Sequence, residues 1–278
     1  VSTTVPPQGL YPKTDLTDYL VKLEKPVRVN AASGNIPAGF LAPYGIEQWG
    51  GYDGLYPARM MEFQTRLGKD LWNAMEPVCG ITHYLHDPRL DKADFPMEAS
   101  PGQFVRETEL DGIAVYRNTH ALPRAFLVGG IEVIQDFDAR FDRMASKAYD
   151  PTAIVVTEPH PAISEQSAAL PPGKSPQIGT ARVLHRESRL VVVEAQANRD
   201  AVLVLSDAYY PGWRATLNGE PAPLFPAYTV FRGLVLPPGT HRVEYRYDPI
   251  SFKLGLIISA CSIAAYLAVA WRTRKRNH

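Results

Sequence analysis

The last part of the chain is an uninterrupted run of apolar and small residues. Leu254–Trp271 contains 18 residues and no charged one. At an α-helical rise of ~1.5 Å per residue this run spans about 27 Å, close to the hydrocarbon thickness of a bilayer. A buried helix of a soluble domain usually keeps a polar stripe, whereas this run offers little beyond Ser259 and Ser262. The pattern predicts a transmembrane helix, which we place at residues 250–271.

Charged and aromatic residues at the two ends of this helix predict its orientation. Lys253 lies at one end and Trp271 at the other, where both side chains suit a membrane interface. The tail 272–278 carries four cations, at Arg272, Arg274, Lys275 and Arg276. The positive-inside rule assigns this tail to the cytoplasm and residues 1–250 to the extracytoplasmic side of the membrane. The alternative, a tail-anchored protein with a cytoplasmic globular part, puts the basic tail on the wrong side.

Export of such a domain needs a signal. The chain starts with Val1, and no basic region followed by an apolar stretch comes after it. We therefore expect either a signal that has been removed or further transmembrane helices upstream in the same parent chain.

From about residue 180 the apolar positions follow the period of β-strands. Strands are predicted at Leu190–Ala197, Ala201–Ser206, Trp213–Leu217, Tyr228–Leu236 and His241–Tyr247. Asn218-Gly219 predicts a two-residue hairpin, because both central residues of a type I′ turn need positive φ. In the last strand Val243, Tyr245 and Tyr247 share one face. Short strands at this spacing predict a β-sandwich of immunoglobulin-like or jelly-roll type over residues 180–249.

The part before it mixes helical and strand patterns. Helices are predicted at Asp15–Lys25, with Thr14 as N-cap, and at Met60–Leu67 and Asp136–Lys147. Strands are predicted at Val27–Asn30, Ile81–Leu85, Phe104–Glu109, Ile113–Arg117, Ala125–Val128 and Ile154–Val156. We expect an α+β domain over residues 1–156. Residues 157–179 contain five prolines and few large apolar residues, which predicts a linker or a long exposed loop.

Composition and charge narrow the function classes. Hydrophobic residues make up 45% of the chain and charged residues 21%, as in ordinary globular proteins. Removing the four tail cations from a net charge of zero leaves −4 for residues 1–253, so no basic face suits nucleic acid. Cys261 lies in the predicted membrane helix and Cys79 outside it, so no disulfide is expected.

Few residue patterns point to catalysis. His83 and His86 have the spacing of metal ligands on a helix, but on a strand their rings point to opposite faces. Glu47 and Asp53 flank a loop rich in glycine and aromatic residues, a weak glycosidase-like signal. Phosphate-binding loops and nucleophile elbows are not found in the sequence. We therefore predict no catalytic residue, no metal site and no cofactor.

Aromatic side chains give the candidate binding residues. Tyr209, Tyr210 and Trp213 surround Pro211-Gly212 in a turn, where exposed rings could stack on sugars. The alternative is that Trp213 fills the sandwich core, as buried aromatics usually do. Tyr52 and Asp53 complete the candidate set.

One long stretch resembles a known family. Ser206–Pro249, SDAYYPGWRATLNGEPAPLFPAYTVFRGLVLPPGTHRVEYRYDP, followed directly by a membrane helix, resembles the C-terminal end of YfhO-type bacterial membrane proteins. Weaker pieces of the resemblance are residues 51–55, 115–118 and 122–128. The resemblance implies a polytopic protein similar to GT-C-class glycosyltransferases, which transfer sugars from polyprenyl-phosphate carriers to acceptors of the cell envelope. In that class the acidic catalytic residue lies in an early loop, so none of its catalytic residues is carried over here.

The resemblance leads to one hypothesis, and two alternatives come from other classes of function. The first is a non-catalytic accessory region of a membrane glycosyltransferase that positions the glycan acceptor or lipid carrier. The second is a structural or protein-interaction ectodomain, which predicts an apolar surface patch and no groove of the size of a sugar. The third, a hydrolase, needs a pair of convergent carboxylates. The expected partners are the lipid bilayer, upstream transmembrane helices of the parent chain and an envelope glycan or polyprenyl-linked sugar, and no nucleic acid.

Overall fold

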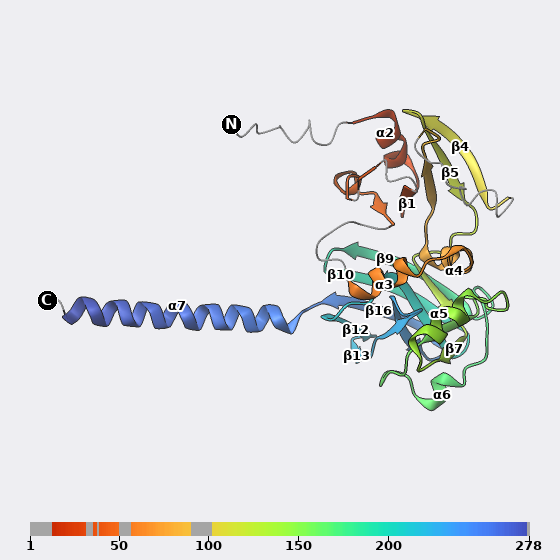
Figure 1. Cartoon of the computed structure of the whole chain (residues 1–278). Helices are drawn as coiled ribbons and strands as arrows, with labels where there is room; N and C mark the ends of the chain where they lie inside the picture. The colour runs from red at the N-terminus through yellow and green to blue at the C-terminus, as the bar shows by residue number, and fades with distance from the viewer. Residues whose placement is uncertain (1–12, 32–35, 38, 50–56, 90–101, 277–278) are drawn as a thin grey trace.

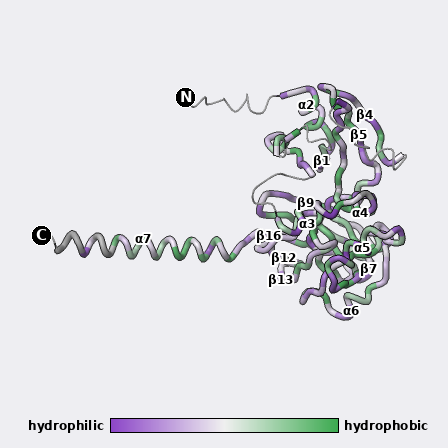
Figure 2. Tube along the Cα trace, in the orientation of Figure 1, coloured by the Kyte–Doolittle hydropathy of each residue, from purple (hydrophilic) through white to green (hydrophobic). Residues whose placement is uncertain are grey.

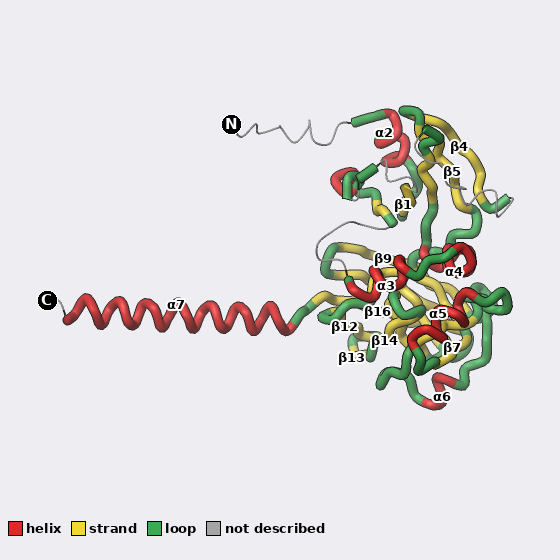
Figure 3. Tube along the Cα trace, viewed as in Figure 1, coloured by secondary structure: helices red, strands yellow, loops and turns green. Residues whose placement is uncertain are grey.

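The computed structural model describes residues 13–31, 36, 37, 39–49, 57–89 and 102–276. Figure 1 shows an N-terminal sheet, a larger body beside it and a long helix that leaves this body. Figure 3 shows that the larger body contains many strands, with the short helices α3, α4, α5 and α6 around them. The predicted fold class, an α+β part followed by an all-β sandwich and a C-terminal helix, is confirmed.

The N-terminal sheet has five strands and one covering helix. Its strand order is β2 (Glu47–Gln48), β1 (Arg28–Ala31), β3 (His83–His86), β5 (Ile113–Asn118) and β4 (Phe104–Leu110). Strands β2 and β3 run parallel to β1, and the other pairs are antiparallel. Thr14 is the N-cap of helix α2 (Asp15–Lys22), as predicted, and it forms a capping box with Thr17. The helix ends three residues before the predicted Lys25 and buries Leu16 and Leu20 against the sheet.

The sandwich consists of two antiparallel sheets. One has the order β13 (Glu220–Ala222), β12 (Trp213–Leu217), β16 (Gly239–Tyr247), β10 (Leu190–Ala197) and β9 (Gly179–Glu187). The other has the order β14 (Phe225–Ala227), β15 (Phe231–Leu236), β11 (Ala201–Ala208) and β6 (Ala125–Val128). Apolar side chains such as Val193, Leu203 and Val243 fill the space between them. Strand β6 precedes the proline-rich segment 157–179, so the second sheet takes one strand from the earlier part of the chain.

Helices and a parallel strand pair cover the outer face of the second sheet. They are α3 (Ala58–Thr65), α4 (Lys69–Met75), α5 (Phe137–Ala145), β7 (Gly130–Val133) and β8 (Ile154–Thr157). Phe63, Met75 and Phe141 pack there against Val204 and Phe231. The second sheet is therefore buried on both faces, which is why the apolar run of β11 is continuous and does not alternate. Short helical turns complete the fold: η1 (Ala42–Tyr44) lies between β1 and β2 of the N-terminal sheet, and η2 (Glu76–Cys79) and α6 (Glu165–Ala168) follow later in the chain.

Two turns show how local sequence sets the strand boundaries. Asn218 and Gly219 have φ of 54° and 93°, so the predicted tight hairpin between β12 and β13 is confirmed. The predicted strand Tyr228–Leu236 begins three residues late, at Phe231. Tyr228 and Thr229 have φ of 50° and 66°, which is incompatible with a strand and makes the turn between β14 and β15.

Helix α7 (Ile250–Arg276) follows β16 after Asp248-Pro249. Residues Ile250–Leu267 are long and apolar enough to cross a membrane, and no part of this window is buried in the protein. Figure 2 shows hydrophobic residues recurring along this helix, coloured green on the Cα trace. A long apolar window that is not buried in the protein fits a lipid environment.

Candidate functional site

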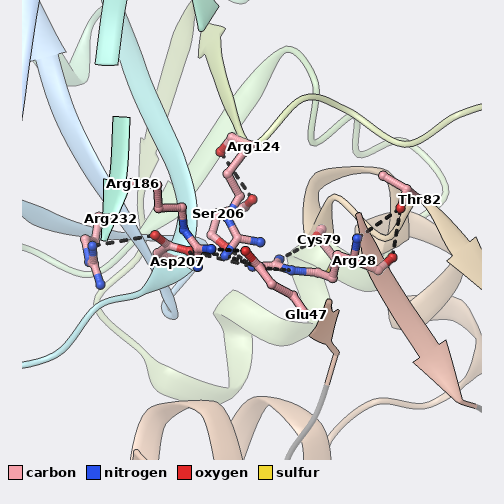
Figure 4. Close-up of polar contacts among 9 residues, drawn as sticks. All are labelled: Arg28, Glu47, Cys79, Thr82, Arg124, Arg186, Ser206, Asp207 and Arg232. Carbon is pink, nitrogen blue, oxygen red and sulfur yellow. Dashed lines mark hydrogen bonds and ion pairs between the residues drawn. The ribbon is translucent and has the colours of Figure 1, made fainter. Parts of the chain in front are cut away.

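Six charged residues meet where the N-terminal sheet contacts the sandwich (Figure 4). We call this group the arginine cluster; its members are Arg28, Glu47, Arg124, Arg186, Asp207 and Arg232. Arg28 is the first residue of β1, Glu47 is the first residue of β2, and Arg124 directly precedes β6. Arg186 belongs to β9, Asp207 to β11 and Arg232 to β15 of the sandwich.

Glu47 is the carboxylate that joins the two parts of the protein. It accepts from Arg28 Nε at 3.4 Å and pairs with Arg124 Nη2 at 2.7 Å. It also pairs with Arg186 of β9. Its side chain is only partly buried, and a surface ion pair contributes little. Three guanidinium groups on one carboxylate form a network, however, and they bring β1, β2, β6 and β9 together.

Asp207 is the second carboxylate and is almost fully buried. It pairs with Arg124, and it lies 3.6 Å from Arg28 Nη2 and 3.7 Å from Arg232 Nη1. Arg186 Nη2 lies at 3.9 Å. All four arginines of the cluster are therefore within ion-pair distance of this one side chain.

Backbone carbonyl groups take up other donors of the cluster. Arg28 donates from Nη1 to the Cys79 carbonyl at 2.5 Å and from Nη2 to the Ser206 carbonyl at 3.0 Å. Arg232 donates from Nε to the Ala208 carbonyl at 3.0 Å. Burial lowers the pKa of Arg232 to about 10, while Asp207 opposes this effect. The guanidinium therefore stays charged at neutral pH although it is desolvated.

The cluster carries more positive than negative charge. Among the described residues it holds four guanidinium groups and two carboxylates, an excess of two positive charges. The Arg124 and Arg232 side chains are 7% and 5% exposed. Arg124 Nε and Arg232 Nη1 are buried without a hydrogen-bond acceptor. Buried donors are normally paired, so these two atoms need an explanation.

Two cavities open beside the cluster. One has a volume of about 470 Å³ and is lined by Arg28, Thr82 and Arg182 among others. The other has a volume of about 400 Å³ and is lined by Lys25 and by residues of β9 that include Arg186. Glu47, Arg124, Pro26 and Val183 line both cavities. Volumes of this size accommodate a small ligand.

Strand register places the cluster at the end of the sandwich where α7 begins. Arg186 pairs with Val191 across β9 and β10, and Val191 pairs with Tyr245 across β10 and β16. Tyr245 precedes the first residue of α7, Ile250, by five positions. At a rise of ~3.3 Å per residue this level lies within about 17 Å of the helix start.

The aromatic turn predicted as a binding site lies at the same end of the sandwich. Trp213 packs at the edge of the sandwich core, with Arg232 Cζ 3.5 Å from its ring centroid and the Tyr247 ring 5.4 Å away. The Tyr209 ring lies 5.7 Å from Arg59 Cζ of α3, and its hydroxyl lies 3.4 Å from Nε2 of His160, which follows β8. Burial raises the pKa of Tyr209. Tyr210 is 44% exposed.

The aromatic turn therefore does not form one open surface. The Trp213 ring packs on Arg232 of the arginine cluster, Tyr209 is half-buried, and Tyr210 faces solvent. The other two candidate binding residues, Tyr52 and Asp53, lie outside the described residues.

The residues predicted to orient the membrane helix lie at its ends. Lys253 Nζ pairs with Asp248 at 2.6 Å, just before the first turn of α7. Trp271 and Arg272 are exposed near the other end. Arg274, Lys275 and Arg276 belong to the last helical turns.

Sequence reasoning found only Glu47 of the arginine cluster, and assigned it to a different pair. A signal was present for two others, because Asp207 and Arg232 interrupt apolar strands at positions that should be buried. Buried charged residues are rare unless they are paired. Arg28, Arg124 and Arg186 gave no such signal, since an arginine at the start or end of a strand usually faces solvent.

The comparison with protein families concerns the C-terminal third of the chain. Residues 176–259 match the family model of the bacterial membrane protein YfhO. The YfhO resemblance expected from Ser206–Pro249 is thereby confirmed. The matched region runs from just before β9 into α7, and it contains Arg186, Asp207 and Arg232 of the cluster. No curated protein and no solved structure gives a significant match to the chain.

The family match and the apolar helix α7 both indicate a membrane protein. A family of membrane proteins and a helix long enough to span a bilayer both give this chain a membrane context. The chain is therefore a membrane-associated protein with YfhO-like residues next to its membrane helix.

Proposed function

We propose that this chain is the C-terminal extracytoplasmic region of a polytopic cell-envelope glycosyltransferase that uses polyprenyl-linked sugars. In this proposal the region is not catalytic itself. It positions the glycan acceptor or the lipid carrier beside the bilayer, while upstream transmembrane helices of the parent chain hold the reaction centre. The observation that carries the proposal is the pair of cavities beside the arginine cluster, one of them lined by Arg186 near the start of α7.

The orientation of the membrane helix supports an extracytoplasmic position. The basic residues after Trp271 favour the cytoplasmic side for the tail. Residues 1–250 then lie on the other side of the membrane, where lipid-linked sugars are used by enzymes of the GT-C class. The cavities would face ligands held within reach of the bilayer surface.

The chemistry of the cluster favours binding over catalysis. Each of its two carboxylates is engaged by three or more arginines. A general acid or nucleophile needs a carboxylate that is free to meet the substrate, as paired carboxylates of glycosidases are. The hydrolase hypothesis therefore finds no support in this site.

The protein-interaction hypothesis predicts an apolar surface patch. Outside α7, the described large apolar side chains that are exposed come from six different segments: Val21, Met61, Val105, Val133, Leu184 and Tyr210. Scattered single residues of this kind are normal on any soluble surface. The cavities thus favour the ligand-positioning hypothesis.

The test blocks the cavities in the full-length parent protein. Val183 lines both cavities, so Val183→Trp should reduce sugar transfer or alter acceptor choice. Glu187→Trp on the same strand is the control, because this exposed residue lines neither cavity. Membrane insertion of both variants is checked by protease protection. If deletion of residues 1–250 leaves sugar transfer and acceptor choice unchanged, the proposal is wrong.

A further inference from the structure

The arginine cluster has more positive charge than its own carboxylates balance. Two excess positive charges are held among side chains that are mostly buried. An unpaired buried charge is costly, and removal of one partner from a buried ion pair typically costs several kcal/mol. A protein that keeps such an excess has a reason to bind an anion there.

Unused hydrogen-bond donors point in the same direction. Arg124 Nε is buried without an acceptor, and Arg124 lines both cavities. Lys25 and His185 line the smaller cavity beside Arg186, which adds further donors around its opening. The desolvated guanidinium of Arg232 lies behind them on the Trp213 ring and keeps the local potential positive.

We propose that the arginine cluster binds a phosphate or pyrophosphate group, with Arg124 at the base of the site and Arg186 at its entrance. This inference rests on the proposed function for the location of the ligand, and it adds the chemical group that is recognised. Planar guanidinium groups match the oxygen atoms of phosphate in a bidentate manner. A dianion would balance the excess of two charges.

Arg186 suits the role of the entrance residue because it is the most accessible member of the cluster. Its side chain is 40% exposed, whereas the other three arginine side chains are less than one tenth exposed. It can therefore turn from Glu47 to an incoming anion without opening the core. The position near the start of α7 allows two sources of phosphate, a lipid head group in the bilayer or a soluble phosphate.

The experiment measures binding of inorganic pyrophosphate to the full chain in nanodiscs of phosphatidylcholine, by isothermal titration calorimetry. The wild type should bind pyrophosphate, more weakly at high salt. Arg186→Gln should raise the Kd at least about tenfold, the usual effect of losing a hydrogen bond to a charged group. Arg242→Gln is the control, because it removes the same charge from an exposed site of β16 that lines neither cavity.

A second variant changes affinity in the opposite direction. Glu47→Gln removes one of the two competing carboxylates, so it should lower the Kd for pyrophosphate. This increase in pyrophosphate affinity keeps the inference testable even if Arg186→Gln does not fold. The inference is refuted if the wild type binds no pyrophosphate, or if Arg186→Gln and Arg242→Gln weaken binding equally.

A change of lipid distinguishes the two sources of phosphate. In nanodiscs with phosphatidylglycerol, a lipid head group that occupies the site will compete and weaken pyrophosphate binding. Unchanged binding assigns the site to a soluble phosphate. If pyrophosphate does not bind but Val183→Trp still impairs sugar transfer, the phosphate inference fails and the proposed function stands.

Discussion

The buried carboxyl group of Glu76 should make the free energy of unfolding depend on pH. Its buried carboxylate accepts from Tyr84 Oη at 3.0 Å and from Gln103 Nε2 at 2.7 Å, and Asn118 also donates to it. Burial raises the pKa of Glu76 from 4.5 to about 7, although the hydrogen bonds from Tyr84 and Gln103 oppose this effect. Desolvation thus outweighs the donors that stabilise the ionised form.

The sign and size of the effect follow from the two pKa values. Between pH 4.5 and about 7 the unfolded chain has lost this proton while the folded chain still holds it. Stability falls with rising pH wherever the folded state binds more protons. At about 1.4 kcal/mol for each tenfold change in proton affinity, the free energy of unfolding should fall by about 3 kcal/mol across this range. Above about pH 7 the contribution is constant.

The assay compares the wild type with Glu76→Gln, which has a similar shape and does not titrate. Guanidinium unfolding of the detergent-solubilised full chain, followed by tryptophan fluorescence, gives the free energy of unfolding at several pH values. The difference between variant and wild type should grow by about 3 kcal/mol in favour of the variant from pH 4.5 to 7. Taking the difference cancels other titrating groups. A difference that stays flat with pH would refute the reasoning.

Two further substitutions test the region between the aromatic turn and α7. Trp213→Ala removes the ring that covers Arg232 and should lower the free energy of unfolding by about 2–4 kcal/mol, measured by chemical denaturation; a loss below 0.5 kcal/mol would show that this ring is not part of the packed core. Gly212→Ala should cost about 1–3 kcal/mol, seen as a lower melting temperature. Gly212 has φ of 102°, and an added Cβ would lie 3.0 Å from the Tyr247 ring and 3.1 Å from Pro249; an unchanged melting temperature would contradict this.

Much of the fold could be predicted from local patterns. Strands Leu190–Ala197, Trp213–Leu217 and Ala125–Val128 have the predicted bounds, because alternating or continuous apolar residues and flanking turn residues determine them locally. Pairing between distant strands has no such local signal. The sheet that joins β6 to β11 brings together segments separated by more than 70 residues, and the intervening chain was expected to separate two domains.

The candidate site was less predictable than the fold. Its members extend from Arg28 to Arg232, and no two of them are closer than 19 residues in the chain. Arg28, Arg124 and Arg186 taken alone look like solvated side chains, and only the contact between the N-terminal sheet and the sandwich groups them with Asp207 and Arg232. The aromatic turn attracted attention because its residues are consecutive, whereas a cluster assembled by tertiary contacts has no spacing to recognise.

The short connection between β16 and α7 determines how motion in the membrane reaches the rest of the protein. Asp248 and Pro249 are the only residues between them, and the Asp248 N–H donates to the Gly212 carbonyl at 2.8 Å. Strand β16 is in turn hydrogen-bonded on both sides, to β12 and β10. The helix and the sheet are therefore rigidly connected and should move together. A change of helix tilt, caused by bilayer thickness or by neighbouring helices, would rotate the sandwich and the cavities with it.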